Sequence, residues 1–375
     1  MPGLLPDVDP DGLLEFSVVY TDRALNHMSK RFQQVMCDLS AGLKQAYGAA
    51  AAVIVPGSGS VGMEAVARQF ATGRKVLVLR NGWFSYRWSQ ILDMGGIAES
   101  STVLKARIQG PGPQAPFAPA PIDEVVATIR RERPALVFAP HVETSAGLML
   151  PDDYLRALAS AVHEVDGLLV LDCIASGAIW VDMAAIGVDI LVSAPQKGWS
   201  STPCCGLVML GERALARIEA TTSTSFALDL RKWLQIMRAY EGGGHAYHAT
   251  LPTDGLTQLR DVMQEAMTIG LEELRQAQVR LGAEVRALLE GRGIRSVAAP
   301  GFQAPCVVVS YTDRPDWQNA RAFAAQGLQV AAGVPLACDE PEGFSSFRIG
   351  LFGLDKLTNV QRSVASLKGA LDRMG

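Results

Sequence analysis

Two polar residues that follow apolar segments of this chain could take part in the same covalent chemistry. Asp172 follows the apolar run at 167–171, and Lys197 comes shortly after a second such run at 189–193. A lysine amine can form a Schiff base with a carbonyl group, and a carboxylate can keep a pyridine nitrogen protonated so that the ring accepts electrons. Pyridoxal phosphate requires both groups. Taken singly, Asp172 could instead be a helix cap and Lys197 a solvated loop residue.

A glycine-rich loop supplies a candidate phosphate site. The segment GSGSVG at 57–62 lies between an apolar run and a helical pattern, and it matches the G-x-G-x-x-G fingerprint of dinucleotide-binding proteins. That fingerprint also requires an acidic residue at the end of the next strand, where this chain has Arg-Asn-Gly at 80–82. NAD is therefore disfavoured, and an NADP-dependent oxidoreductase is an alternative. The loop N–H groups and the hydroxyls of Ser58 and Ser60 could equally hold a single phosphate, and a purely structural turn is the third interpretation.

Hydrophobic periodicity predicts the elements that would position these residues. Continuous apolar runs alternate with amphipathic helical patterns, which indicates an α/β fold with a mostly parallel sheet covered by helices on both faces. Ligands of such sheets bind at the carboxyl ends of the strands. A helix is predicted from Ser29, with Gly48 as its C-terminal cap. The predicted strands are 52–55, 75–79, 135–139, 167–171, 189–193 and 206–210, with helices at 60–70, 121–132 and 152–165.

The pattern changes near Pro252, and a second, smaller α/β domain is predicted after it. The predicted division is an extended N-terminal segment at 1–28, a large domain at 29–255 and a small domain at 256–375. The stretch at 110–121, rich in Pro, Ala and Gly, is predicted to be a surface loop. Within the small domain we expect a long helical segment at 256–289, strands at 306–311 and 346–349, and helices at 316–326 and 355–374.

Composition excludes several classes of protein. The chain has 375 residues, 49% hydrophobic and 19% charged, with a net charge of −4, whereas disorder requires low hydrophobicity and high charge. No basic cluster indicates nucleic acid, no apolar run reaches the roughly 18 residues of a membrane span, and the first residues do not form a signal-peptide pattern. The six cysteines lack CxxC spacing, which indicates reduced thiols in a cytoplasmic protein. The low charge content suggests a partner subunit.

Eight segments together resemble the class V aminotransferases of fold type I, and most closely the alanine–glyoxylate and serine–glyoxylate aminotransferases. Each segment alone is a weak signal, but together they are highly specific and extend from about Asn26 to the C-terminus. The segments are HMSKRF (27–32), PGSGSVGMEA (56–65), RNGWFSYR (80–87), HVETSAG (141–147), LDCIASGA (171–178), SAPQKGW (193–199), YHATLP (247–252) and FRIGLFG (347–353).

The resemblance implies a homodimer that uses pyridoxal phosphate to transfer an amino group between an amino acid and a 2-oxo acid of the glyoxylate or pyruvate type, by ping-pong kinetics. It makes Lys197 the Schiff-base and proton-transfer lysine, Asp172 the partner of the pyridine nitrogen and Arg348 the residue that binds the substrate carboxylate. Tyr247 and Thr250 would reach the phosphate of the neighbouring subunit, so the active sites would be shared. The other implied cofactor residues are Ser58, Gly59, Ser60 and Gln196 at the phosphate, Phe84 and Ile174 on the ring faces, and Thr144 near the 3-oxygen.

The chain departs from this family in the N-terminal segment near the expected substrate pocket. The family has a Gly/Pro-rich segment there, whereas residues 11–29 read DGLLEFSVVYTDRALNHMS. Arg23 or Arg87 could bind a second acidic group of a substrate, or could be a surface or structural charge. The bulkier residues that replace the small ones include Glu15, Phe16, Tyr20 and Arg23.

Lyase or desulfurase chemistry with the same cofactor is an alternative to amino transfer. Desulfurases stack a histidine where this chain has Phe84, and Cys338 is the nearest candidate for their loop cysteine. His245 and His248 could form an H-x-x-H metal pair, but no third ligand lies nearby, and no metal is expected. Arg348 lies in a strand pattern between two apolar residues, so its side chain must point away from both, into a cleft or into solvent.

Overall fold

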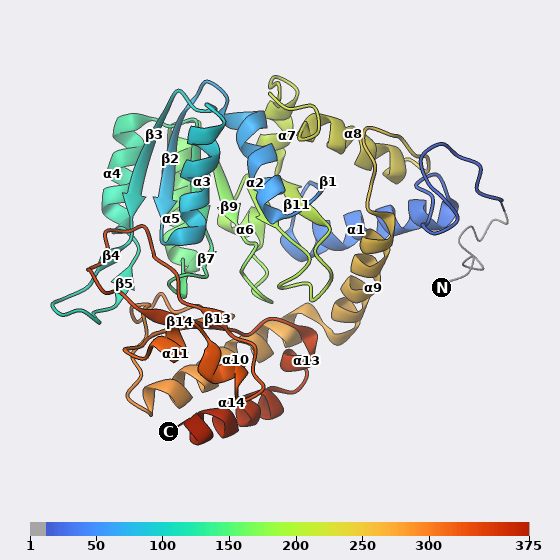
Figure 1. Ribbon diagram of the computed structural model, residues 1–375. Coiled ribbons are helices and arrows are strands. Elements are labelled where there is room, and N and C mark those ends of the chain that lie inside the picture. Colours follow the sequence, from blue (N-terminus) through green and yellow to red (C-terminus); the bar gives the residue numbers. More distant parts are fainter. Residues whose placement is uncertain (1–12, 375) are drawn as a thin grey trace.

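The computed structural model describes residues 13–374 and has two parts, a large sheet surrounded by helices and a smaller sheet with its own helices (Figure 1). Part of the predicted N-terminal segment, residues 1–12, lies outside the described residues. The smaller part contains most of the elements after α9 (Thr253–Ile269), which are orange and red in Figure 1. None of the helices within residues 13–374 is both long and apolar enough to cross a membrane.

The large sheet has seven strands in the order β1-β11-β10-β9-β6-β2-β3. The neighbours from β10 to β3 are all parallel, and β11 runs antiparallel to both β1 and β10. Every residue of β6, β9 and β10 is buried, because helices cover both faces of the sheet. The predicted mostly parallel α/β sheet is confirmed. Its strands are β1 (Ala51–Pro56), β2 (Lys75–Arg80), β3 (Ser100–Lys105), β6 (Leu136–Pro140), β9 (Leu168–Asp172), β10 (Ile190–Ser193) and β11 (Cys205–Leu210).

Local sequence signals set the helix ends near this sheet. Helix α1 (Lys30–Tyr47) begins after Ser29, whose hydroxyl accepts the N–H of Phe32 at 3.1 Å, and ends at Gly48, whose φ is +61°. Helix α2 continues through one π-helical turn, η1 (Ala67–Ala71). The other helices of this part are α2 (Gly59–Val66), α3 (Trp83–Met94), α4 (Ile122–Glu132), α5 (Asp152–Glu164), α6 (Met183–Ile186), α7 (Glu212–Ile218) and α8 (Leu230–Glu241).

The smaller sheet is antiparallel, in the order β12-β14-β13. Helices α10 and α14 pack against each other beside it, whereas α9 packs against α1 of the larger part (Figure 1). The elements are α10 (Leu271–Glu290), β12 (Val307–Tyr311), α11 (Pro315–Gln318), α12 (Arg321–Ala324), β13 (Ala331–Ala332), β14 (Ser346–Gly350), α13 (Leu354–Leu357) and α14 (Val360–Met374).

Three helices predicted as continuous are interrupted. The segment at 256–289 divides into α9 and α10 at Gly270, whose φ of +109° is incompatible with a helix. The predicted helix at 316–326 divides at Ala320, which has a φ of +66°. The predicted closing helix divides into α13 and α14, and the side chain of Asn359 caps the second by accepting the N–H of Arg362 at 3.0 Å.

The prediction of a surface loop at 110–121 is wrong for its second half. Phe117 is only 1% exposed and belongs to the short strand β5 (Phe117–Ala118), which pairs with β4 (Arg107–Ile108). Its backbone N–H donates to Val297 O at 2.7 Å, and its carbonyl accepts the N–H of Ala299 at 2.8 Å. Phe117 therefore connects the larger part of the molecule to the smaller part.

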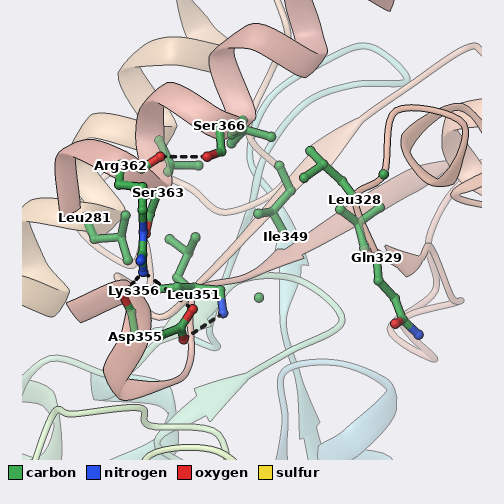
Figure 2. A pocket seen from close by; sticks show the side chains of 15 residues that line it. Leu281, Leu328, Gln329, Ile349, Leu351, Asp355, Lys356, Arg362, Ser363 and Ser366 are labelled. Atoms are coloured by element: carbon green, nitrogen blue, oxygen red, sulfur yellow. Dashed lines mark hydrogen bonds and ion pairs between the residues drawn. The ribbon is translucent and has the colours of Figure 1, made fainter. Parts of the chain in front are cut away.

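A cavity of about 410 Å³ lies beside β14 in the smaller part (Figure 2). Ile349 and Leu351 contribute apolar side chains to it, and α14 contributes Ser363 and Ser366. Because neighbouring strand residues point to opposite faces, the side chain of Arg348 is directed away from this cavity.

Candidate active site

The glycine loop lies at the carboxyl end of β1 and leads into α2. Gly57 has a φ of +128°, a conformation that favours glycine, and its N–H donates to Cys204 O at 2.9 Å. A Cβ on Gly59 would come within 2.7 Å of Ile174 Cδ1, so this position has no room for a side chain. The hydroxyl of Ser58 makes no capping bond to α2. Backbone N–H groups at the start of α2 are therefore available to an anion.

Arg87 adds a cation to this loop. Its Nη1 donates to Ser60 Oγ at 2.8 Å, and its guanidinium carbon lies 5.4 Å from the centre of the Phe84 ring. The sequence interpretation considered Arg87 as a contact for a second acidic group of the substrate, or as a surface or structural charge. Its position instead places its charge beside the loop that is expected to bind phosphate.

Asp172 ends β9 and is almost fully buried. Its Oδ1 accepts the N–H of Ile174 at 2.9 Å, the only hydrogen bond recorded for this carboxylate among residues 13–374. Burial raises the pKa of Asp172 to about 6, although the Ile174 N–H and the charge of Lys197 oppose the rise. A cationic or N–H-bearing partner would relieve this unfavourable burial.

Lys197 follows β10, the parallel neighbour of β9, so that the two residues meet at the same edge of the sheet. Its Nζ lies 5.9 Å from the ring centre of Phe84 and 5.8 Å from that of Phe352. Burial lowers the pKa of Lys197, and the charge of Asp172 opposes this change. Burial opposes the charged form, so the neutral amine that a nucleophile or base requires forms more readily here than in water.

Arg348 reaches the same cluster from β14. Its flanking residues, Phe347 and Ile349, are buried, while its Nε donates to Ala332 O at 2.8 Å and its Cζ lies 5.4 Å from the Phe84 ring centre. Burial lowers the pKa of Arg348, and the charge of Glu143 opposes this. Its Nη groups make no hydrogen bond to any residue from 13 to 374, which leaves a fork that fits a carboxylate.

The loop after β6 contributes Thr144, which is buried. It directly follows Glu143, the last residue of the short strand β7 (Val142–Glu143), which pairs with β8 (Leu148–Met149). In the same loop, His141 is buried, and its Nδ1 lies 2.7 Å from Ser176 Oγ. Burial lowers the pKa of His141 to about 4. Its backbone N–H donates to Asp172 O at 2.9 Å, so the loop is joined to the end of β9.

Other predicted residues lie apart from this cluster or at its surface. Tyr247 is 55% exposed, and its hydroxyl lies 3.2 Å from Thr250 Oγ1. No contact recorded within residues 13–374 joins either residue to Lys197. Gln196 is exposed next to Lys197.

The described end of the N-terminal segment packs against the chain around Tyr247. The Tyr20 hydroxyl donates to Leu251 O at 3.0 Å, and the ring of His27 lies 5.6 Å from that of Tyr247. Glu15 is bonded to Asn26 Nδ2 at 2.8 Å. Phe16 is 88% exposed. Within one chain, the described end of the N-terminal segment therefore packs against the segment around Tyr247, and not against Lys197.

The two histidines of the H-x-x-H pair each contact other residues. His248 Nε2 bonds to Phe226 O at 2.8 Å, while His245 meets His27 ring to ring at 5.8 Å. Residues 13–374 contain no group of three or more His, Cys, Asp or Glu side chains that could hold a metal ion.

Glu143 and Phe352 are site residues that the sequence interpretation did not assign. Both lie within segments that carry the family resemblance, HVETSAG and FRIGLFG. The resemblance was therefore a signal that could have placed them near the site. Glu143 is buried and accepts three hydrogen bonds from the N-terminus of α3 and two from Ser145 of its own loop. Nothing in the local sequence indicates that partner, because α3 lies about 60 residues earlier in the chain.

The sheet, the strand-end pair and the glycine loop define an α/β enzyme of fold type I. A solved alanine–glyoxylate aminotransferase from Nostoc sp. has this fold, with a TM-score of 0.79, 22% identity and coverage of 93% of this chain and 88% of that one. Residues 14–345 match the family model of aminotransferase class V. The chain belongs to the class V aminotransferase family and is an enzyme that transfers amino groups between amino acids and 2-oxo acids.

Two curated relatives span nearly the whole chain. A 2-aminoethylphosphonate–pyruvate transaminase from Paraburkholderia phymatum is 30% identical over 94% of this chain and 90% of the relative. An alanine–glyoxylate aminotransferase from Oryctolagus cuniculus is 27% identical over 92% of this chain and 86% of the relative. Membership of this family favours the single-phosphate interpretation of the glycine loop over the NADP interpretation.

Proposed function

We propose that this enzyme uses pyridoxal phosphate to transfer the amino group of a small α-amino acid to glyoxylate or pyruvate. The observation that carries the proposal is the meeting of Lys197 and Asp172 at one sheet edge, with Phe84 and Arg348 beside them. The residues fit the cofactor: Asp172 is a buried carboxylate with a free oxygen, and the start of α2 offers N–H groups at a loop with no room for a side chain on Gly59.

Each group of residues would have a distinct task with the cofactor. Asp172 would hold the pyridine nitrogen, Phe84 and Ile174 the two ring faces, and Thr144 the 3-oxygen. The phosphate would bind to Ser58, Gly59 and Ser60, with Gln196 and Arg87 adjacent. When bound, pyridoxal phosphate supplies the Schiff-base carbonyl and an electron sink.

The chain's own residues would then orient the substrate and move its proton. Arg348 would bind the α-carboxylate through its fork and so orient the bond from Cα to hydrogen. Lys197, whose pKa is lowered by burial, would take the proton from the substrate Cα through Nζ and then donate it to the carbonyl carbon of the cofactor. Phe84 and Phe352 would exclude water from Nζ.

The identity of the lysine tests this proposal directly. Wild-type protein reconstituted with pyridoxal phosphate should be yellow. Reduction with borohydride should bleach the colour and leave the cofactor covalently attached to Lys197. Lys197→Ala should still bind the cofactor, but borohydride should not attach it covalently to the protein. Protein that stays colourless after reconstitution, or a label on another lysine, would contradict the proposal.

A substrate panel distinguishes amino transfer from the lyase alternative. Alanine should be offered as a donor with glyoxylate, and serine and 2-aminoethylphosphonate each with glyoxylate and with pyruvate. Amino transfer consumes donor and acceptor in equal amounts, whereas a lyase consumes the donor without an acceptor. Failure of alanine with glyoxylate and of serine with both acceptors would remove the proposed substrates.

We also propose a homodimer in which Tyr247 and Thr250 complete the partner's site. Their exposure in one chain supports this, as does the neighbouring apolar surface: Leu14 is 82% and Val18 102% exposed. If sites are shared, mixing inactive Lys197→Ala with inactive Tyr247→Ala subunits creates one intact site in each mixed dimer, which restores about a quarter of wild-type activity after full exchange. If Tyr247 serves its own chain, mixing restores nothing. Either variant mixed with itself is the control.

We place the enzyme in the cytoplasm, which is consistent with the free state of all six cysteines. Fractionation of cells that express the full chain would test this, and recovery outside the cytosolic fraction would contradict it.

A further inference from the structure

Glu143 is a fully buried carboxylate to which the proposed reaction gives no role. No arginine, lysine or histidine within residues 13–374 forms an ion pair with it, although an ionised carboxylate is costly to bury without compensation. The compensation comes from hydrogen bonds. Oε1 accepts the N–H groups of Phe84 at 3.2 Å and of Ser145 at 3.0 Å, and Oε2 accepts the N–H of Ser85 at 2.8 Å.

Two hydroxyls complete the shell around this carboxylate. Ser145 Oγ lies 2.7 Å from Oε1, and Ser85 Oγ lies 2.7 Å from Oε2. Ser145 Oγ also accepts the N–H of Trp83 at 2.9 Å. The first three N–H groups of α3, which have no partner within the helix, are thus all taken up by the loop after β6. A negative charge at a helix N-terminus is further stabilised by the helix dipole.

The contact between this loop and α3 is close and leaves no room for a side chain on Gly82. A Cβ on Gly82 would come within 2.1 Å of Ser145 Oγ and 2.6 Å of Glu143 Cγ. Phe84 is the second residue of α3, and its ring lies 5.9 Å from Lys197 Nζ and 5.4 Å from Arg348 Cζ. The position of Glu143 therefore determines where the Phe84 ring lies relative to both groups.

We propose that Glu143 is a positioning residue whose carboxylate fixes the N-terminus of α3 and thereby holds the Phe84 ring in place for the cofactor. This inference rests on the proposed function, because Phe84 stacks on a ring only if pyridoxal phosphate binds there. The adjacent Thr144, expected at the 3-oxygen, belongs to the same loop. The Glu143 carboxylate would therefore help to position both the Phe84 ring and Thr144.

Glu143→Gln is the sharpest perturbation. Both carboxylate oxygens accept backbone N–H groups, so the amide nitrogen of glutamine must face a donor in either orientation. The dissociation constant of pyridoxal phosphate should be measured on the apoprotein by quenching of tryptophan fluorescence. We expect Glu143→Gln and Phe84→Ala each to weaken binding about 10-fold, because misplacing the ring loses no more than removing it.

The double variant distinguishes positioning from general destabilisation. If Glu143 acts through Phe84, adding Glu143→Gln to Phe84→Ala should weaken binding by no more than about threefold. Equal weakening in both backgrounds would overturn the inference while leaving the proposed function intact. A wild-type protein that fails to bind pyridoxal phosphate would overturn both.

Two further variants control for folding. If Glu143→Gln does not fold, Ser145→Ala can replace it, since it removes the hydroxyl between Glu143 and Trp83. Ser145→Ala should then weaken cofactor binding less in the Phe84→Ala background than in the wild type. Asp189 is also a buried carboxylate that accepts a backbone N–H, from Leu169 at 2.7 Å, but it lies at the opposite end of β10. Asp189→Asn should lower the melting temperature and leave the dissociation constant within about twofold of wild type; a comparable loss of affinity would overturn the inference.

Discussion

Replacing Asp172 by asparagine should stabilise the apoprotein at neutral pH. Burial raises the pKa of Asp172 to about 6 from a usual value of 3.8, so the folded protein binds this proton more tightly than the unfolded chain. Ionisation above pH 6 therefore costs folding free energy. Asparagine resembles the neutral acid and keeps the bond from the Ile174 N–H, so it avoids that cost.

The pKa difference sets the size of the effect. A change from 3.8 to about 6 corresponds to about 3 kcal/mol at 1.36 kcal/mol per pKa unit. The stability penalty of the wild type is absent below pH 4, grows as the pH rises from about 4 to 6 and is complete at pH 7.5. Asp172→Asn should therefore match the wild type at pH 4 and exceed its free energy of unfolding by up to about 3 kcal/mol at pH 7.5.

Urea unfolding of both apoproteins, followed by tryptophan fluorescence at pH 4 and 7.5, would measure this difference. Asp189→Asn is the matched control, because Asp189 is also buried but is hydrogen-bonded to His163 Nε2 at 2.9 Å and forms an ion pair with Arg213 Nε at 3.2 Å. It should lose about 3–5 kcal/mol at pH 7.5. The reasoning is refuted if Asp172→Asn is less stable than the wild type at pH 7.5, or if the difference between them does not change with pH. The same variant should bind pyridoxal phosphate more weakly, since it removes the partner of the pyridine nitrogen.

Three other variants probe separate parts of the site. Lys197→Ala should lower kcat by at least about 10³-fold while cofactor binding persists, because it removes both nucleophile and base; substantial turnover would exclude Lys197 from the chemistry. Arg348→Lys keeps the charge but loses the fork, so KM for an α-amino acid should rise about 10- to 100-fold with cofactor affinity unchanged; an unchanged KM would mean that another group binds the carboxylate. Gly82→Ala places a Cβ within 2.1 Å of Ser145 Oγ and should cost about 1–3 kcal/mol of stability, measured by urea unfolding; wild-type stability would show that the contact can relax.

Six of the seven strands of the large sheet were predicted because they are continuous apolar runs, a pattern that arises from burial on both faces. Strand β3 was missed because it lies at the edge of the sheet, is partly exposed and has only two apolar residues in SSTVLK. The interruptions escaped prediction because distant partners cause them. At Ala320, for example, the helix stops where Gln318 O accepts the N–H of Gly333 instead of continuing the helical ladder. Phe117 is similar, since its hydrogen-bond partners lie about 180 residues later in the chain.

The candidate site was predictable to different degrees. The strand-end positions of Asp172 and Lys197 could be derived from periodicity alone, because parallel strands end at one edge. Placing Arg348 beside Phe84 required the family resemblance, since periodicity only showed that it faces a cleft or solvent. The hydrogen bonds of Glu143 to α3 could not be derived from the sequence, because helix N-termini can be capped by any nearby acceptor. The roles of Tyr247 and Thr250 remain predictions.

The antiparallel strand β11 has a consequence for how the chain folds. It lies between β1 and β10, and the N–H of Gly57 is held by Cys204 O, although the two residues are roughly 150 positions apart. During synthesis, β1 and the phosphate loop therefore cannot form their native pairing until β11 has been made. Arg348 is synthesised later still. Pairings of such long range close slowly and leave a strand edge open meanwhile. Truncated chains that end before β11 should be prone to aggregation and unable to retain the cofactor.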